Sequence, residues 1–182
     1  SNHAVLDLHG NYRAIRPSWT QIAQSAKKGD TQVVLKETVG WKSGDTVVLA
    51  GTGFADDPKS QMEELTISSI SSDKKTITFT KMLQYEHFGE LQTYGGRVLD
   101  ERAEIGMISR NVVIQGDGKT KYFGGHVMIM EGAIARIEGV ELRDVGQARL
   151  GRYPIHYHCF NAEPMGDLSY VRGNAVHSSW NR

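Results

Sequence analysis

A short motif, consisting of a β-branched residue, any residue and then glycine, recurs in the second half of the chain and constrains its fold more than any other feature. It occupies residues 114–116, 137–139 and 171–173, so its glycines are 23 and 34 residues apart. Such intervals are typical of a β-solenoid, in which each coil buries its inward residues against the neighbouring coils and the longer interval carries an inserted loop. Glycine permits the tight corners of such a coil, as does asparagine at Asn111, Asn174 and Asn181. The periodicity alone leaves a β-sandwich open as the alternative.

The first half of the chain consists of short runs rich in β-branched residues, at 31–35, 45–50, 65–70 and 76–80. Apolar and polar residues alternate along them, which predicts antiparallel strands with one buried and one exposed face. Before these runs, residues 21–28 carry Ile22, Ala23 and Ala26 on one side and stop at Gly29. This pattern predicts a short helix near residues 19–28.

These patterns together predict an all-β chain with two parts. Residues 1–100 are expected to form a small antiparallel β module with the short helix, and residues 101–182 the coils of a parallel β-helix. The last strand-like run lies close to residue 182, so we expect the β-helix to continue in further sequence.

The charge balance limits the classes of partner. Lys and Arg number 21, as do Asp and Glu, which gives a formal net charge of zero. A large basic surface for nucleic acid is therefore not predicted. The apolar runs are much shorter than the roughly 20 residues of a membrane-spanning helix, so no membrane-spanning segment is expected in this sequence.

The sequence GRYPIHYH at residues 151–158 concentrates the side chains with the most chemical potential. Because side chains alternate along a strand, His156 and His158 are predicted to lie on one face, and Ile155 and Tyr157 on the other. Two imidazoles on one face could be metal ligands, a general base with its partner, a platform for sugar hydroxyls, or hydrogen-bonded structural residues. For a metal, His126 is the candidate third ligand.

The neighbouring side chains have the composition of a polysaccharide groove. Guanidinium groups bind uronic-acid carboxylates in bidentate fashion, and tyrosine rings stack on sugar faces. The candidate substrate-binding residues are His126, Arg143, Gln147, Tyr153 and Tyr157. The alternative is that they are solvated edges of successive coils.

Two reactions fit the candidate catalytic residues. Hydrolysis of a glycosidic bond needs two carboxyl groups, for which Glu141 and Asp144 are the candidates. A lyase instead needs a base, His156 or His158, and a cation such as Arg152 to stabilise the enolate. The residues alone do not choose between these reactions.

The order and spacing of several motifs resemble the G8-domain family, which includes hyaluronan-binding proteins, hyaluronidases and fibrocystins. The motifs are LDLHG at 6–10, SWT at 18–20, WKSGD at 41–45, YEH at 85–87, RAEIG at 102–106, SRN at 109–111, GGH at 124–126, GVEL at 139–142, GQ at 146–147 and GRYPIHYH. The resemblance implies a region just after the G8 module, leading into a right-handed parallel β-helix of the pectate-lyase type.

The resemblance also implies a function and a location. Members of the family are secreted or lie at the cell surface, and some bind and depolymerise hyaluronan in a calcium-dependent way, whereas fibrocystins are receptor-like. The positions carried over as a polar face are His126, Glu141, Gln147, Arg152, His156 and His158. We therefore expect an extracellular or cell-surface domain that binds or depolymerises an acidic polysaccharide, with a structural receptor segment as the alternative. Calcium or another divalent metal is the candidate cofactor, and an acidic loop with Asp56, Asp57, Glu63 and Glu64 could in principle hold it, although a solvated loop is favoured.

Overall fold

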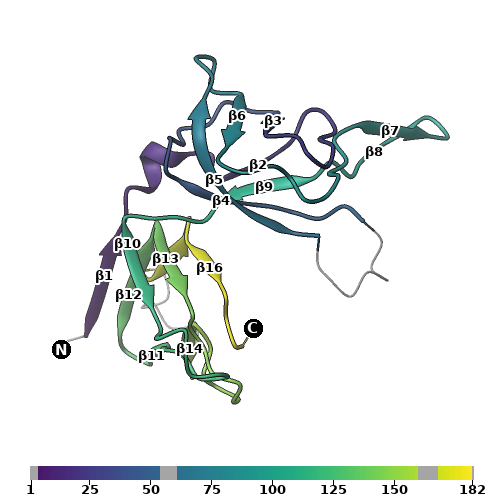
Figure 1. The fold of residues 1–182 in the computed structure, drawn as a ribbon. Coiled ribbons are helices and arrows are strands. Elements are labelled where there is room, and N and C mark those ends of the chain that lie inside the picture. Colours follow the sequence, from purple (N-terminus) through teal and green to yellow (C-terminus); the bar gives the residue numbers. More distant parts are fainter. Residues whose placement is uncertain (1–3, 54–60, 160–167, 182) are drawn as a thin grey trace. The chain divides into compact units, whose positions relative to one another are not determined.

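The computed structural model describes residues 4–53, 61–159 and 168–181, which form two compact units (Figure 1). Residues 13–109 form one unit, here called the barrel unit, and residues 1–12 with 110–182 form the other, here called the coil unit. The predicted all-β class is confirmed, with a 3-10 helix, η1 (Tyr12–Ile15), at the start of the barrel unit. The units differ from the predicted division at residue 100 because the first strand of the chain pairs within the coil unit.

The barrel unit contains one antiparallel sheet that closes on itself. Its strand order is β2-β9-β4-β5-β6-β3, and a bridge between Ile22 and Leu35 joins the two outer strands. Closure leaves no long free edge to pair with another chain. A separate hairpin of β7 and β8 extends from this sheet (Figure 1). The strands of the unit are β2 (Trp19–Gln21), β3 (Gln32–Val34), β4 (Thr46–Leu49), β5 (Glu63–Ile70), β6 (Thr76–Phe79), β7 (Leu91–Tyr94), β8 (Arg97–Asp100) and β9 (Glu104–Met107).

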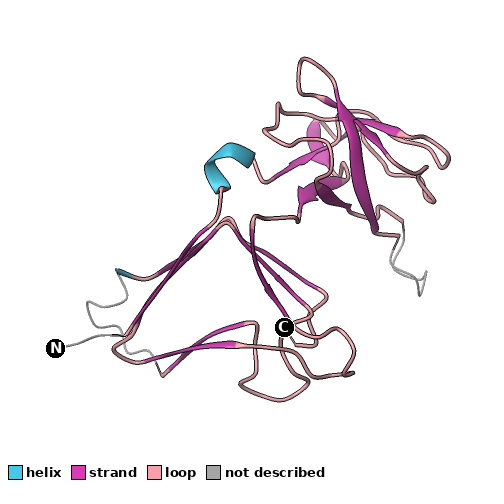
Figure 2. Cartoon of the chain, turned by 60° about the vertical axis from the view of Figure 1, so that its left-hand side comes forward, coloured by secondary structure: helices cyan, strands magenta, loops and turns pink. Residues whose placement is uncertain are grey.

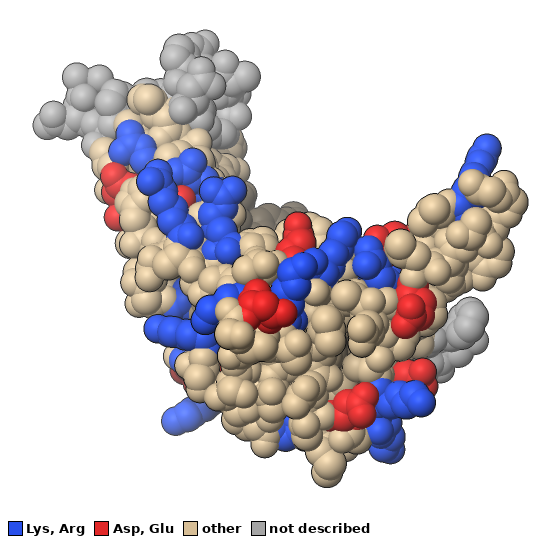
Figure 3. All heavy atoms as spheres, turned by 90° about the horizontal axis from the view of Figure 1, so that it is seen from above, with Lys and Arg blue, Asp and Glu red and all other residues tan. Residues whose placement is uncertain are grey.

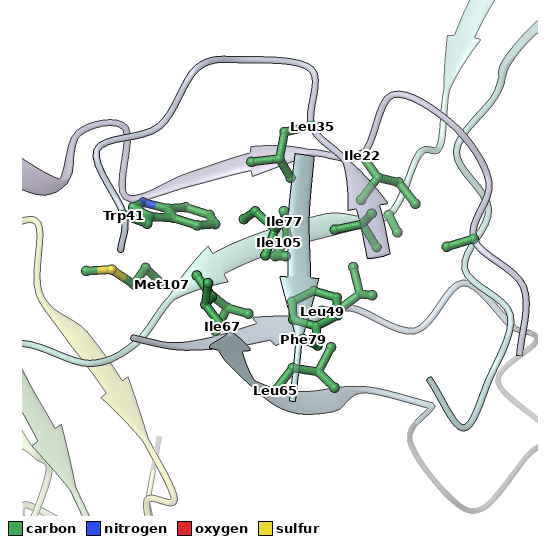
Figure 4. Packing of buried hydrophobic residues seen from close by; sticks show 14 of the residues in the cluster. Ile22, Leu35, Trp41, Leu49, Leu65, Ile67, Ile77, Phe79, Ile105 and Met107 are labelled. Atoms are coloured by element: carbon green, nitrogen blue, oxygen red, sulfur yellow. The ribbon is translucent and has the colours of Figure 1, made fainter. Parts of the chain in front are cut away.

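The core of the barrel unit is built by the inward residues of these strands. Leu49, Ile67 and Ile105 are fully buried around the centre of the sheet, and Trp41 closes one end of the core (Figure 4). The indole N–H of Trp41 donates to the carbonyl oxygens of Ile15 and Pro17 at 3.1 and 2.9 Å. A large apolar ring is thus buried without leaving its polar atom unsatisfied.

The helix predicted near residues 19–28 is not formed. Residues 19–21 are strand β2, while Ile22 bridges to Leu35 and Ala26 bridges to His87. Ile22 and Ala26 are buried, as the predicted apolar face required. The burial is supplied by antiparallel neighbours rather than by a helix, because tertiary pairing outweighs a weak local propensity.

In the coil unit all strand pairs are parallel and form three sheets. The sheets are β1-β12-β15, β10-β13-β16 and β11-β14, and they make three sides of the coil in Figure 2. The inner face carries a cluster that includes Ile137, Val140, Leu142 and Val145. The strands are β1 (Val5–His9), β10 (Val112–Gln115), β11 (Val127–Met130), β12 (Ile134–Glu138), β13 (Val140–Arg143), β14 (Ile155–His158), β15 (Tyr170–Arg172) and β16 (Ala175–His177).

The register of these sheets confirms one predicted repeat and corrects the other. Glu138 pairs with Arg172, so the interval of 34 residues between Gly139 and Gly173 is one coil. The interval of 23 residues is not a coil, because Gln115 pairs with Arg143, at a separation of 28 residues. The glycine at 116 therefore lies at a different corner from the other two.

The barrel unit is inserted in the chain at one corner of the coil. β1 and β10 occupy the positions that β12 and β13 occupy in the next coil, and residues 13–109 lie between them in sequence. In the later coils this corner is Gly139 alone or Gly173 followed by Asn174, and the two glycines have φ of 64° and 62°. A Cβ atom on Gly173 would lie 2.3 Å from the ring of Tyr12, so the corner needs glycine for space as well as for backbone conformation.

Two of the three asparagines predicted at corners, Asn111 and Asn174, hold this corner, whereas Asn181 binds the carbonyls of Gln147 and Arg149. Asn111 accepts the backbone N–H of Asn11 through Oδ1 at 2.6 Å. Two coils later, Asn174 accepts the backbone N–H of Val140 at 2.7 Å and donates to the carbonyl of Ile137 at 2.8 Å. In the part of the chain that the structure describes, no helix has the length and apolar character needed to span a bilayer.

Candidate functional site

The GRYPIHYH sequence ends in strand β14, which pairs in parallel with β11. Ile155 packs against the inner apolar cluster of the coil, and the Tyr157 hydroxyl donates to the carbonyl of Ala135 at 3.3 Å. Burial raises the pKa of Tyr157. Because side chains alternate, His156 and His158 lie on the outer face of the sheet.

The two histidines form a row with Tyr153. The ring centroids of His156 and His158 lie 5.1 Å apart in an edge-to-face arrangement, and those of Tyr153 and His156 lie 5.1 Å apart in the same kind of arrangement. The Nδ1 atom of His156 donates to the carbonyl of Gly151 at 2.8 Å. This bond fixes the orientation of the ring and leaves Nε2 as its remaining polar atom.

Arg152 and His126 form a second contact beside this row. The guanidinium donates from Nη1 to Nε2 of His126 at 3.0 Å. Since a guanidinium has no acceptor, this ring nitrogen is the acceptor of the contact. We use the name histidine face for the set His126, Arg152, Tyr153, His156 and His158.

The histidine face does not have the ligand geometry of a metal site. Among the described residues, no group of three His, Cys, Asp or Glu side chains is placed to hold a metal ion. The candidate ligands His126, His156 and His158 do not form such a group, and Nε2 of His126 accepts a hydrogen bond from Arg152. Asp56 and Asp57 of the predicted acidic loop lie outside the described residues.

The predicted catalytic residue Glu141 lies on a different side of the coil, in β13. It is only 4% exposed, and its carboxylate accepts the backbone N–H of Arg110 at 3.1 Å, Nε2 of His177 at 3.0 Å and Nη1 of Arg143 at 3.4 Å. Arg143 also donates to the side chain of Gln115 at 2.8 Å. The sequence prediction missed His177, although the interval of 34 residues places it beside Arg143 in the sheet.

The predicted residues Asp144 and Gln147 lie in the segment that follows β13. Asp144 adopts φ of 53° at a bend of the coil, and Gln147 donates from its side chain to the carbonyl of Gly124 at 3.1 Å. The backbone N–H of Gln147 donates to the carbonyl of Arg152, and Asn181 donates to the carbonyl of Gln147, both at 2.8 Å. These contacts position the loop that carries Arg152.

The third side of the coil carries a ladder of paired charges. Arg136 binds Asp7 at 3.1 Å, Arg172 binds Glu138 at 3.0 Å, and His9 contacts both carboxylates. The hydrogen bond from His9 keeps the pKa of Asp7 below its usual range, and the hydrogen bond from Arg172 does the same for Glu138. Figure 3 shows a similar mixture on one face of the molecule, where Lys and Arg side chains lie near Asp and Glu side chains. Charges satisfied in this way are poorly suited to capture an anionic ligand.

Comparison with known proteins confirms the predicted resemblance. Residues 122–182 match the family described as the CEMIP beta-helix. The chain is 36% identical over 98% of its length to Fibrocystin-L of Homo sapiens, 34% identical over 97% to a G8 domain-containing protein of Dictyostelium discoideum, and 32% identical over 82% to the cell surface hyaluronidase CEMIP2 of Homo sapiens.

The chain is a small part of each relative, corresponding to 5% of Fibrocystin-L, 15% of the Dictyostelium protein and 12% of CEMIP2. Among solved structures, the tailspike protein gp49 from Pseudomonas phage LKA1 is similar with a TM-score of 0.37 and 12% sequence identity. That match covers 80% of this chain and 23% of the tailspike.

Proposed function

Because this chain is a homologue of G8-domain proteins over nearly its whole length, we propose that its coil unit is a segment of a right-handed parallel β-helix that binds an acidic polysaccharide of the hyaluronan type. We further propose that it does so outside the cell or at the cell surface, as the name of its relative CEMIP2 states for that protein.

One observation carries this proposal. Arg152, Tyr153 and the imidazoles of His156 and His158 lie together at the outer face of the sheet of β11 and β14. Arg152 is the cation that a uronate carboxylate would meet. The Nε2 atom of His156 can exchange hydrogen bonds with a sugar hydroxyl, and the Tyr153 ring offers an apolar surface for a pyranose face.

Binding fits this face better than hydrolysis. Acid–base cleavage of a glycosidic bond needs two carboxyl groups around the scissile bond, and the histidine face contains none. Glu141 is buried and already accepts three donors. A lyase reaction, with a histidine base and Arg152, remains chemically compatible with the face and is tested below.

The test is a titration of the chain with hyaluronan oligosaccharides in which binding is measured by calorimetry. Arg152→Ala should weaken binding by about 1.5–3 kcal/mol, the usual worth of a hydrogen bond to a charged group, which is roughly 10- to 150-fold in Kd. The matched control is Arg136→Ala, because Arg136 lies on another side of the coil and is paired with Asp7. Equal weakening by both substitutions would contradict the assignment.

The same samples test the alternatives. The alternative is that the segment is a structural part of a receptor. In that case His156→Ala should lower the melting temperature, because the hydrogen bond to Gly151 is lost, and no glycan should bind. If the face is a lyase site, the wild-type chain should shorten hyaluronan and leave unsaturated ends. His156→Ala should then abolish both the shortening and the formation of unsaturated ends.

A further inference from the structure

The barrel unit contains a large pocket that the proposed function does not use. Its volume is about 920 Å³, and it lies where β2, β4 and β9 meet the base of the hairpin of β7 and β8. This size is within the range of small-molecule sites. The side chains that determine its chemistry are Gln21, Phe88, Gln92, Tyr94, Asp100 and Arg102.

One wall of the pocket is held rigid by an ion pair. Arg102, whose side chain is 10% exposed, donates to the two carboxylate oxygens of Asp100 at 2.8 and 2.6 Å. Gln21 donates to the same carboxylate at 3.2 Å. The hydrogen bonds from Arg102 lower the pKa of Asp100 to about 2, so the pair stays ionised under ordinary conditions.

This pairing decides which ligands the pocket can accept. The guanidinium of Arg102 is already engaged and is not available for a carboxylate of the ligand. Glu101 and Glu104 also line the pocket, and within the described residues neither forms an ion pair with a basic side chain. Lys36, whose Nζ lies 3.9 Å from the Asp100 carboxylate, offsets one of these charges. The remaining charge is therefore negative, which opposes an acidic sugar.

The rim supplies the groups that recognise a neutral sugar. Tyr94 is 64% exposed, so its ring is accessible to the apolar face of a pyranose. Its hydroxyl donates to the side chain of Gln92, which orients an amide beside the ring. Planar amides and carboxylates match the hydroxyl groups of a sugar, because amides donate and accept, and ionised carboxylates accept, in fixed directions. We propose that this pocket binds a neutral saccharide residue, separately from the acidic polysaccharide of the histidine face.

The proposal is tested on the full chain by saturation-transfer NMR with glucose, galactose, mannose and N-acetylglucosamine, each at millimolar concentration. At least one should bind saturably, and Tyr94→Ala should weaken that binding by about 10-fold, as expected for the loss of one stacking contact. The control is Val98→Ala, which removes an exposed apolar side chain from the same hairpin but outside the pocket.

The outcomes separate this site from the proposed function. Tyr94→Ala should leave hyaluronan binding unchanged, and Arg152→Ala should leave neutral-sugar binding unchanged. The proposal is overturned if the wild-type chain binds none of the four sugars, if glucuronate binds as tightly as glucose, if ethanolamine binds and the sugars do not, or if Val98→Ala weakens binding as much as Tyr94→Ala.

Discussion

Replacement of Glu63 by alanine should destabilise the barrel unit more than any exposed substitution in the same strand. Glu63 is 6% exposed and accepts the backbone N–H groups of Gln84 and Tyr85 at 2.9–3.1 Å. It also binds Nε2 of His87 at 3.0 Å. His87 is fully buried, and its Nδ1 atom donates to the carbonyl of Ala50 at 2.8 Å.

The magnitude follows from what the substitution leaves behind. One buried donor, Nε2 of His87, and two partly buried backbone donors lose their acceptor, and an unsatisfied buried donor costs about 1–3 kcal/mol. Removal of one partner of a buried ionisable pair typically costs about 3–5 kcal/mol, and we expect a loss in this range because water can reach part of the vacated space. Since 1 kcal/mol shifts the melting temperature of a unit of this size by roughly 4–8 °C, the decrease should be at least about 12 °C.

The assay is thermal unfolding monitored by the fluorescence of Trp41, which is 1% exposed in the barrel core. A background with Trp19→Phe and Trp180→Phe isolates this signal. Glu64→Ala is the matched control, because Glu64 is the next residue of β5 and is exposed. The reasoning is refuted if Glu63→Ala and Glu64→Ala lower the melting temperature equally.

Three further outcomes are expected. Burial opposes ionisation of Glu63, but the hydrogen bonds from Gln84 and His87 outweigh it and lower the pKa of Glu63. The contribution of Glu63 to stability should therefore be complete above the ordinary carboxyl pKa and be lost as the pH falls through the lowered value. Acid titrations of stability should show this dependence in the wild-type chain and not in Glu63→Ala. Gly173→Ala should destabilise the coil unit in denaturant more than Gly132→Ala, because both have positive φ but only Gly173 has another group, Tyr12, within 3 Å of the added Cβ. Ile137→Ala, at a fully buried inner position, should cost about 2–5 kcal/mol in the same assay, and a cost below about 1 kcal/mol would mean that the coil core is not tightly packed.

Local sequence patterns predicted the strands well, and long-range pairing was the part they could not supply. The alternation in GRYPIHYH is a local property of one strand, so it correctly placed Ile155 and Tyr157 opposite to His156 and His158. The apolar spacing of Ile22 and Ala26 is equally compatible with a helix and with bridges to distant residues. Only the presence of Leu35 and His87 beside them decides between the two.

The candidate site was only partly predictable, because its contacts join residues that are distant in the sequence. Arg152 and His126 are 26 residues apart, and nothing local in the sequence indicates that they touch. The closeness of Glu141 and Asp144 in sequence predicts a carboxyl pair, but Glu141 instead binds His177, which is 36 residues away. The coil length of 28 residues between Gln115 and Arg143, which the glycine spacing does not show, is what assigns these residues to different sides of the coil.

The insertion of the barrel unit at a corner of the coil has a consequence for the order of folding. Asp7 and Arg136 pair across 129 residues of chain, and closing a flexible loop of roughly 100 residues costs about 4 kcal/mol of entropy. Folding of residues 13–109 would bring Asn11 and Asn111 together, where they form a hydrogen bond of 2.6 Å. We therefore expect the barrel unit to fold early and β1 to join its sheet late, so that the first coil forms slowly when the barrel unit is destabilised.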